Sequence, residues 1–170
     1  LFANNEQGFF YDPNDLSTMW QDQAKLLPVT GGGQPVWHIL DKSGNNNHAF
    51  ATSSATRPML QRNATTGAYY LAFDGADDFL RTNNIDFTAT DKVSLFVGVR
   101  KLSDAAIAIL CELSSDINAN NGSFYLAAPL NVATKGFAIN AKGTTSYTAV
   151  SANNIAAPVS AVIIGHADLR

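Results

Sequence analysis

The sequence contains a single cysteine, Cys111, and only 15% of its 170 residues are charged. One cysteine cannot form an intrachain disulfide, which excludes a disulfide-rich scaffold. Cys111 lies in the apolar run AIAILCEL, which favours a buried, unreactive thiol over a reactive one. The low charge predicts a surface rich in Asn, Ser, Thr and Gln. Such a surface suits an extracellular or virion protein that meets neutral, hydroxyl-rich partners.

The sequence also lacks a basic cluster, a long apolar run and a signal peptide, and each absence bears on the class of protein. The sequence has no basic cluster and its net charge is -3, so it does not offer the grouped phosphate contacts that nucleic-acid binding needs. No apolar run reaches about 18 residues, so no membrane span is expected. No signal peptide is visible, and the chain begins at Leu1 without Met, so we expect a fragment or a processed chain.

Short strand-like segments dominate the sequence. In residues 92–100, KVSLFVGVR, three valines and a leucine alternate with other residues, which predicts a strand with one apolar face. Further segments are β-branched or aromatic and are separated by Gly, Asn, Asp or Pro: residues 69–73, 78–82, 106–113, 123–127, 136–140, 146–150 and 159–167. Their regular spacing is typical of a sandwich or barrel. We therefore predict an all-β fold of two antiparallel sheets, with residues 1–170 as a single domain.

Two segments have helical features. Residues 12–20 can hold one turn, because Asp12 can cap a helix and Pro13 suits its first position. Residues 102–113 contain Ala, Leu and Glu, which favour helix. The apolar residues of this second segment alternate at period two from Ile107 onward, so we interpret it as a strand.

The segment DKSGNNNHAF, residues 41–50, gathers polar side chains around a turn. Its Ser-Gly pair and its asparagines favour a tight turn, since both Gly and Asn tolerate positive φ. Asp41 can accept backbone N–H bonds across the loop, and His48 can fix the loop from its far side. Two alternatives to this structural role remain. The loop contacts a ligand directly, or it binds calcium through oxygens that include those of Asp41 and Asn45, although the EF-hand pattern is absent.

The segment FDGADDFL contains a second acidic turn. Its Asp-Gly pair predicts a β-hairpin that joins residues 69–73 to residues 78–82. Asp77 and Asp78, as neighbours on a strand, would point to opposite faces, which argues against a catalytic pair. Three acids near one turn can nevertheless hold a cation, so Asp74 and Asp77 are also candidate metal ligands.

Four motifs occur in an order that resembles a known family: GFFYDPNDLSTMWQD, PVWHILDKSGNNNHAFA, RPML and YYLAFDGADDFL. They look like the laminin-G-like, concanavalin A-like jelly-roll domains of phage and prophage tail-associated proteins. The resemblance covers roughly residues 1–105. It implies a two-sheet jelly roll and a place on a virion that is assembled in the bacterial cytoplasm. Such domains continue past the segment VIIGHADLR, so we expect truncation at Arg170 or an edge supplied by another chain.

Catalytic motifs are missing. Concanavalin-like glycoside hydrolases place Glu-x-Asp-x-x-Glu on one strand, and the nearest acids here, Glu112 and Asp116, do not have this spacing. No Gly-x-Ser-x-Gly elbow, HExxH or phosphate loop occurs, and TGGGQP, residues 30–35, is interpreted as a flexible surface loop. The histidines show no metal-ligand spacing: His38, His48 and His166. We predict that the protein is not an enzyme.

Aromatic side chains can form sugar-binding platforms, and the candidates are Trp20, Trp37, Tyr69, Tyr70, Tyr125 and Tyr147. Burial is the commoner role within strands, and Trp37, beside the glycine-rich loop, is the strongest candidate. We expect a non-enzymatic tail, fibre or baseplate module, present as a homo-oligomer, that binds host surface glycans through several weak sites. A structural or decoration domain that contacts only other virion proteins is the alternative. A glycoside hydrolase is the least supported.

Overall fold

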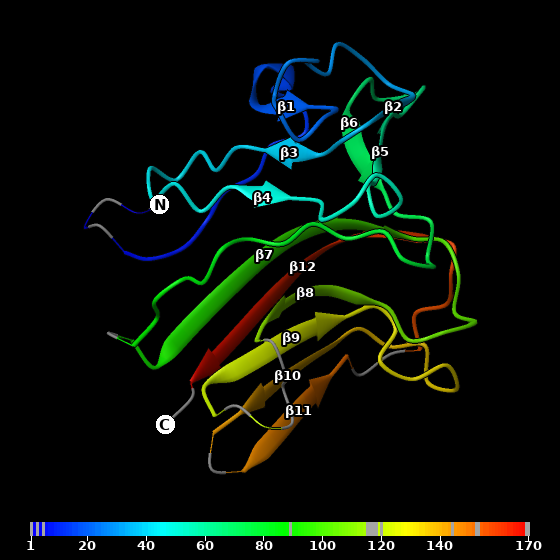
Figure 1. Cartoon of the computed structure of the whole chain (residues 1–170). Coiled ribbons are helices and arrows are strands. Elements are labelled where there is room, and N and C mark those ends of the chain that lie inside the picture. Colours follow the sequence, from blue (N-terminus) through cyan, green and yellow to red (C-terminus); the bar gives the residue numbers. More distant parts are fainter. Residues whose placement is uncertain are drawn as a thin grey trace. The chain divides into compact units, whose positions relative to one another are not determined.

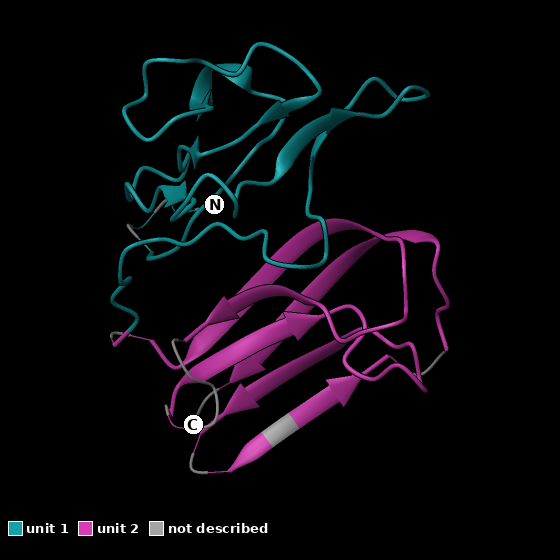
Figure 2. Cartoon of the chain, turned by 45° about the vertical axis from the view of Figure 1, so that its right-hand side comes forward, with its two compact units in different colours: residues 1–87 teal, residues 88–170 magenta. Residues whose placement is uncertain are grey.

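The protein is described by a computed structural model of the whole chain. The described residues are 2, 4, 6–88, 90–114, 119, 121–143, 145–151 and 154–168. Asp116 and Arg170 lie outside them, and the side chain of Tyr147 is not described. The described elements are antiparallel strands and one short 3-10 helix, η1, which confirms the all-β class. Figure 2 shows the two compact units into which the chain divides, residues 1–87 and 88–170. A single domain over residues 1–170 stays a prediction.

Unit 1 contains short strands in two three-stranded sheets, with the orders β1-β3-β4 and β2-β5-β6 (Figure 1). The strands are β1 (Met19–Trp20), β2 (Gln34–Pro35), β3 (His38–Ile39), β4 (Ala49–Phe50), β5 (Met59–Arg62) and β6 (Tyr69–Ala72). The core cluster of this unit consists of Met19, Val29, Val36, Ile39, Ala49 and Leu60. Strands β1, β3, β4 and β5 each contribute one side chain to this cluster, and β2 contributes none. Their pattern is therefore difficult to read from the sequence.

The helical turn of unit 1 begins later than the sequence predicts. The one turn predicted within residues 12–20 is present as helix η1 (Leu16–Thr18), but its N-cap is Asp15 rather than Asp12, and Pro13 precedes it. The Asp12 carboxylate instead accepts the N–H of Asn14 at 3.0 Å, and its carbonyl accepts the N–H of Asp15 at 3.0 Å. Local side-chain bonding of this kind competes with helix formation. Among the described residues, no helix has the length and apolarity needed to traverse a bilayer.

Unit 2 contains longer strands in a four-stranded sheet, β11-β10-β9-β8, and a two-stranded ribbon, β12-β7 (Figure 1). The strands are β7 (Lys92–Lys101), β8 (Ile109–Leu113), β9 (Ser123–Ala127), β10 (Ala138–Lys142), β11 (Ser146–Val150) and β12 (Val159–Asp168). A Cβ built on Gly165 of β12 would lie 2.9 Å from Ile139 Cδ1 and 3.6 Å from Leu126 Cδ1. The ribbon therefore packs closely against the four-stranded sheet.

The alternation predicted for residues 92–100 is confirmed. Leu95 is buried, whereas the outward-facing Phe96 is 63% exposed. β12 pairs with β7 along the whole length of both strands, from Val159↔Lys101 to Asp168↔Lys92. The strands predicted at 123–127 and 146–150 are also confirmed.

The predicted hairpin at the FDGADDFL segment is wrong. β6 pairs with β5, and residues 78–82 form no strand, although Arg81 makes one isolated bridge with Phe50. The Asp74 carboxylate accepts the N–H groups of the next residues and closes a local loop, so these donors are not available to a strand ladder.

Three other boundaries differ from the prediction. Residues 106–108 precede β8 rather than forming its first part, although the strand interpretation holds for Ile109–Leu113. β10 begins at Ala138, two residues later than expected. The glycine-rich segment is not wholly a loop, because its last residues, Gln34–Pro35, pair with β5.

Candidate functional site

The outer face of the β1-β3-β4 sheet carries a row of rings. Trp20, His38 and Phe50 lie side by side in register across the three strands, and all three side chains are half-buried. Their chain neighbours point to the opposite face and are buried in the core: Met19, Ile39 and Ala49. We call Trp20, His38 and Phe50 the aromatic row. The ring centroids of His38 and Phe50 are 6.1 Å apart.

A cation lies at each end of the aromatic row. Lys25 Nζ is 5.6 Å from the Trp20 ring centroid, and Arg81 Cζ is 5.7 Å from the Phe50 centroid. Arg81 reaches this position because its backbone bridges to Phe50, with both N–H···O distances at 2.9 Å. From Trp20 to Arg81 the row crosses three inter-strand spacings, a width of about 14 Å. We call Lys25 and Arg81 the end cations.

The loop that carries Lys25 is held by a carboxylate. Asp22 accepts the N–H of Leu27 at 2.7 Å and the N–H of Leu26 at 3.1 Å, and the Leu27 hydrogen bond is the main cause of a lowered pKa at Asp22. Lys25 itself takes the left-handed conformation, with φ at 57°, which is uncommon for a residue other than Gly. These contacts fix the backbone position of Lys25 beside the row.

The same loop fixes the middle ring. His38 Nε2 donates a hydrogen bond to the Gln23 carbonyl at 3.1 Å, because a carbonyl can only accept. Burial lowers the pKa of His38, the Gln23 bond raises it, and the nearby Lys25 charge lowers it; the net direction is downward. His38 is therefore a neutral ring at neutral pH, with its Nδ1 as a possible acceptor for a hydroxyl group.

Trp37, the strongest candidate from the sequence, occupies a different environment. Its half-buried ring lies 5.8 Å from the guanidinium carbon of Arg57. Arg57 in turn donates to the Gln21 carbonyl at 2.8 Å and to the Ser54 carbonyl at 2.9 Å. These contacts give Trp37 a structural role, and ligand binding by this residue stays a prediction.

The remaining sugar-platform candidates are dispersed. Tyr69 lies under Arg62, whose guanidinium carbon is 5.7 Å from the ring centroid. Tyr70 is 39% exposed. Burial raises the pKa of Tyr125 on β9. The aromatic row groups three rings on one face of a sheet, and only its Trp20 was a sugar-platform candidate from the sequence.

The Asp41 carboxylate is the centre of a hydrogen-bond network that fixes its loop. Its Oδ1 accepts the N–H groups of Phe10 and Ser43, both at 2.8 Å. Its Oδ2 accepts the Ser43 hydroxyl at 2.7 Å and the Asn47 N–H at 3.0 Å. On the other side, His48 Nδ1 accepts the Asp41 N–H at 3.0 Å. The structural role that the sequence suggested for this loop agrees with these contacts.

The two calcium candidates of this loop are engaged by the protein itself. Burial raises the pKa of Asp41, but the hydrogen bonds from Ser43, Phe10 and Asn47 together hold it below its usual range. Asn45 uses its amide as a donor, to the Glu6 carbonyl at 3.0 Å and the Gly8 carbonyl at 3.2 Å. The loop is thus explained without an ion, and calcium binding by Asp41 and Asn45 stays a prediction.

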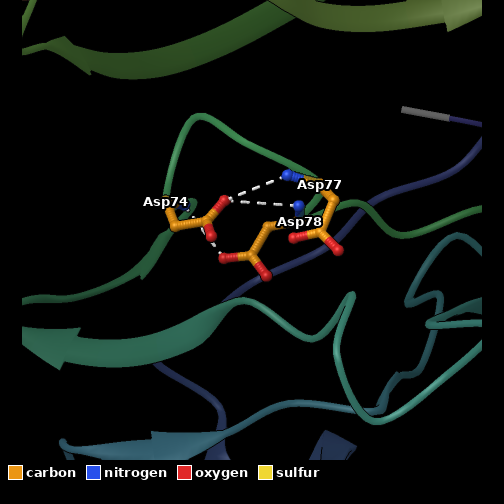
Figure 3. A group of neighbouring side chains, drawn as sticks. All are labelled: Asp74, Asp77 and Asp78. Carbon is orange, nitrogen blue, oxygen red and sulfur yellow. Dashed lines mark hydrogen bonds between the residues drawn. The ribbon is translucent and has the colours of Figure 1, made fainter.

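The acids of the FDGADDFL segment converge (Figure 3). Carboxylate oxygens of Asp74, Asp77 and Asp78 all lie within 4.8 Å of one another. The expectation that Asp77 and Asp78 point apart is wrong, because the segment is a loop rather than a strand. Asp74 Oδ1 accepts the N–H groups of Ala76, Asp77 and Asp78, and the Ala76 bond is the main cause of its lowered pKa.

These acids are hard oxygen ligands of the kind calcium prefers. They are mostly exposed, and their own backbone N–H groups already offset part of their charge. Calcium at Asp74 and Asp77 stays a prediction, and thermal melting with and without a chelator tests it. An unchanged melting midpoint would exclude calcium binding by these acids.

Two other potentially reactive side chains, Cys111 and His166, belong to unit 2, whereas the aromatic row belongs to unit 1. Burial raises the pKa of the Cys111 thiol to about 11, so it is protonated at neutral pH, in agreement with an unreactive role. His166 Nδ1 lies 2.9 Å from Ser94 Oγ on the β7–β12 ribbon. In the part of the chain that the structure describes, only the Asp74 group brings three potential metal-ligating side chains together.

Unit 2 contains a buried ion pair that no sequence pattern indicated. Lys101 is 4% exposed, and its Nζ donates to the carbonyls of Lys135 at 2.7 Å and Ile155 at 2.6 Å. The same Nζ lies 2.6 Å from Asp104 Oδ1, which has no other partner among the described residues. The Ala157 N–H, followed by Lys101, lowers the pKa of Asp104. This arrangement joins three loops and is structural.

Comparison with known proteins finds no matching family model, no matching curated protein and no matching solved structure.

Proposed function

We propose that this chain is a non-enzymatic glycan-binding module of a phage or prophage particle, with a jelly-roll fold, and that the aromatic row is its binding surface. The observation that carries the proposal is the in-register placement of Trp20, His38 and Phe50 on the outer face of one sheet. Ring faces stack on the apolar faces of pyranose sugars, and a neutral imidazole between two rings can bond a hydroxyl group.

The row is held in place before a ligand arrives. Its three residues belong to paired strands, and His38 is also tied to the Gln23 carbonyl. Little side-chain freedom is therefore lost on binding. From Trp20 to Phe50 the row crosses two inter-strand spacings, about 10 Å, which suits a short saccharide segment. Such a shallow site binds weakly, and several copies on one particle would add their affinities through effective concentration.

The proposed place on a virion rests on the sequence motifs. The aromatic row lies within those motifs: Trp20 in GFFYDPNDLSTMWQD, and both His38 and Phe50 in PVWHILDKSGNNNHAFA. The segments that resemble phage tail-associated domains are thus the same segments that build the proposed binding surface. Attachment to a host surface is the function that joins these two observations.

A second candidate is contact with other virion proteins. The outer face of the β7–β12 ribbon exposes large apolar side chains: Phe96 at 63%, Val162 at 77% and Ile164 at 66%. Contiguous apolar surface of this kind is typical of protein contacts.

A glycan array probed with an oligomeric form of the full chain tests the proposal. We expect binding by the natural sequence and a loss of about ten-fold or more in Trp20→Leu and Phe50→Leu, which keep an apolar side chain but remove the ring. Tyr70→Leu, an exposed aromatic outside the row, is the matched control and should bind normally. Absence of binding by the oligomer would favour the structural role, and release of reducing sugar would support a hydrolase.

A further inference from the structure

We propose that the glycan bound by the aromatic row is anionic, and that Lys25 and Arg81 bind its carboxylate or sulfate groups. This inference rests on the proposed glycan-binding function and adds the charge of the ligand. It differs from the expectation of a neutral partner, which came from the low charge of the whole sequence rather than from the charges around one surface.

Neither end cation forms an ion pair with a described residue. This is also true of most other described cations, and the end cations are set apart by their places beside the aromatic row. Paired cations occur elsewhere: Lys42 with Asp12 and Asp15, Lys92 with Asp168, and Lys101 with Asp104. The chain has 14 acidic and 11 basic residues, so acids are in excess overall. Two cations left without a carboxylate partner on one aromatic surface form a local positive site on an acidic protein.

The two end cations outnumber the one acid whose charge acts on the middle ring. Asp22 is the acid whose charge acts on His38, and its carboxylate already accepts the N–H groups of Leu26 and Leu27. His38 contributes no charge at neutral pH, because its pKa is lowered. Lys25 and Arg81 thus place one positive charge at each end of the row, against the single negative charge of Asp22.

The end cations can reach a ligand at small cost. Lys25 is exposed, and so is Arg81, and each rests over its ring at more than 5 Å from the centroid. A cation–π contact at an exposed site is weak. An anionic group on the ligand can therefore draw each cation away from its ring, which also uncovers the ring face for a sugar. The guanidinium of Arg81 can bind a carboxylate or sulfate through two parallel hydrogen bonds.

An acidic glycan fits this surface better than a single-stranded nucleic acid. Nucleic-acid sites combine stacking with a continuous basic groove that follows the phosphates. The row offers only two separated cations, and the sequence contains no basic cluster. The width of about 14 Å from Trp20 to Arg81 suits a chain in which sugar rings lie between charged groups.

The test uses the full chain, in oligomeric form, on an array that pairs acidic glycans with their carboxyl-reduced or desulfated forms. The strongest acidic glycan and its uncharged form are then titrated in solution. We expect the acidic form to bind about ten-fold or more tightly. The preference should fall as salt rises from about 0.05 M to about 0.5 M, because screening weakens exposed charge contacts.

Substitutions of the end cations test whether Lys25 and Arg81 cause the preference for acidic glycans. Lys25→Gln and Arg81→Gln should each weaken acidic-glycan binding by several-fold, and the double variant should bind both glycan forms alike. Arg62→Gln is the matched control, because Arg62 makes the same kind of contact with Tyr69 outside the row. Thermal melting of all variants separates a binding defect from a folding defect.

The outcomes are distinguishable. Equal or stronger binding of uncharged glycans would overturn this inference and leave the proposed function standing. Binding of no glycan at all would overturn both. Stronger binding of a single-stranded oligonucleotide than of any glycan, with loss in the double variant, would overturn the assignment of the site to an acidic sugar.

Discussion

The two units satisfy their backbone hydrogen-bonding groups in different ways. In unit 1, strands β1 to β4 contain two residues each, so their ladders supply few backbone hydrogen bonds. In unit 2, β7 and β12 pair over ten residues, and β9 and β10 over five. Backbone groups in unit 1 therefore depend more on side-chain partners, since buried N–H and C=O groups must be satisfied in some way.

Carboxylates provide many of those partners in unit 1. Asp22, Asp41 and Asp74 each accept two or more N–H bonds from the loops around them. In unit 2 one buried lysine has the corresponding role, because Lys101 binds two loop carbonyls and Asp104. Single side chains thus position loops in both units, but in unit 1 they also position the surface that carries the aromatic row.

The largest effect is expected from Lys101→Met. The variant removes a buried ammonium and leaves two carbonyls and the Asp104 carboxylate without their partner. Breaking a buried charge pair in this way should lower the free energy of unfolding by about 3 kcal/mol or more. Urea unfolding followed by far-UV circular dichroism measures it. Lys92→Met, whose partner Asp168 is 3.9 Å away on the surface, is the control and should change little. Equal stability of the two variants would contradict the structural role of Lys101.

A somewhat smaller effect is expected from Asp41→Asn. The new amide group would face the Ser43 and Asn47 donors, and the charge that strengthens these bonds would be lost. We expect a loss of about 2–3 kcal/mol. Tryptophan fluorescence is the suitable probe, because both tryptophans, Trp20 and Trp37, belong to unit 1.

Lys101→Met and Asp41→Asn also test whether the two units unfold together. If fluorescence and circular dichroism shift together in both variants, the chain unfolds as one cooperative domain, as the sequence predicts. Separate shifts would show two cooperative units. Asp12→Asn is the control for Asp41→Asn, and a loss of similar size in both would contradict the special role of Asp41.

Acid should weaken unit 1 through Asp41. Its pKa is lowered in the folded state from the ordinary value of 3.8, so below that pH the unfolded chain binds more protons than the folded chain. The stability that Asp41 contributes is complete above about pH 4 and is lost as the pH falls through the folded pKa. Stability measured by fluorescence between about pH 5 and pH 2 should fall less steeply in Asp41→Asn. An identical slope would exclude Asp41 as a source of the acid sensitivity.

The long strands could be predicted from the sequence because their patterns are repeated over many residues. Val93, Leu95 and Val97 alternate with outward-facing residues, and this alternation places β7 and its buried face correctly. The two-residue strands of unit 1 have no period to detect. FDGADDFL has the signal of a hairpin, but the Asp74 side chain competes for the N–H groups that a second strand would need.

The candidate site was predicted only in part, because its strands are also too short to show a pattern. Trp20 was a candidate by residue type, but His38 and Phe50 become its neighbours only through the register of strands too short to recognise. Trp37 satisfied the same chemical criterion, yet the Arg57 side chain over its ring is held there by hydrogen bonds to the Gln21 and Ser54 carbonyls. The burial of Lys101 was not predicted, because a buried lysine is recognisable only when its partners at Ile155 and Lys135 are placed.

The smallest effect concerns the packing of the ribbon on the four-stranded sheet. A methyl group at Gly165 would meet Ile139 Cδ1 at 2.9 Å, and this atom is the flexible end of a side chain. Gly165→Ala should therefore cost only about 1 kcal/mol. Ile139→Val removes the opposing atom, so the double variant should recover part of the loss, and the double-mutant cycle measures this coupling. Gly98→Ala is the matched control, because a methyl group there meets no atom within 4 Å. Additive losses at Gly165 and Ile139 would contradict direct packing of β12 on β10.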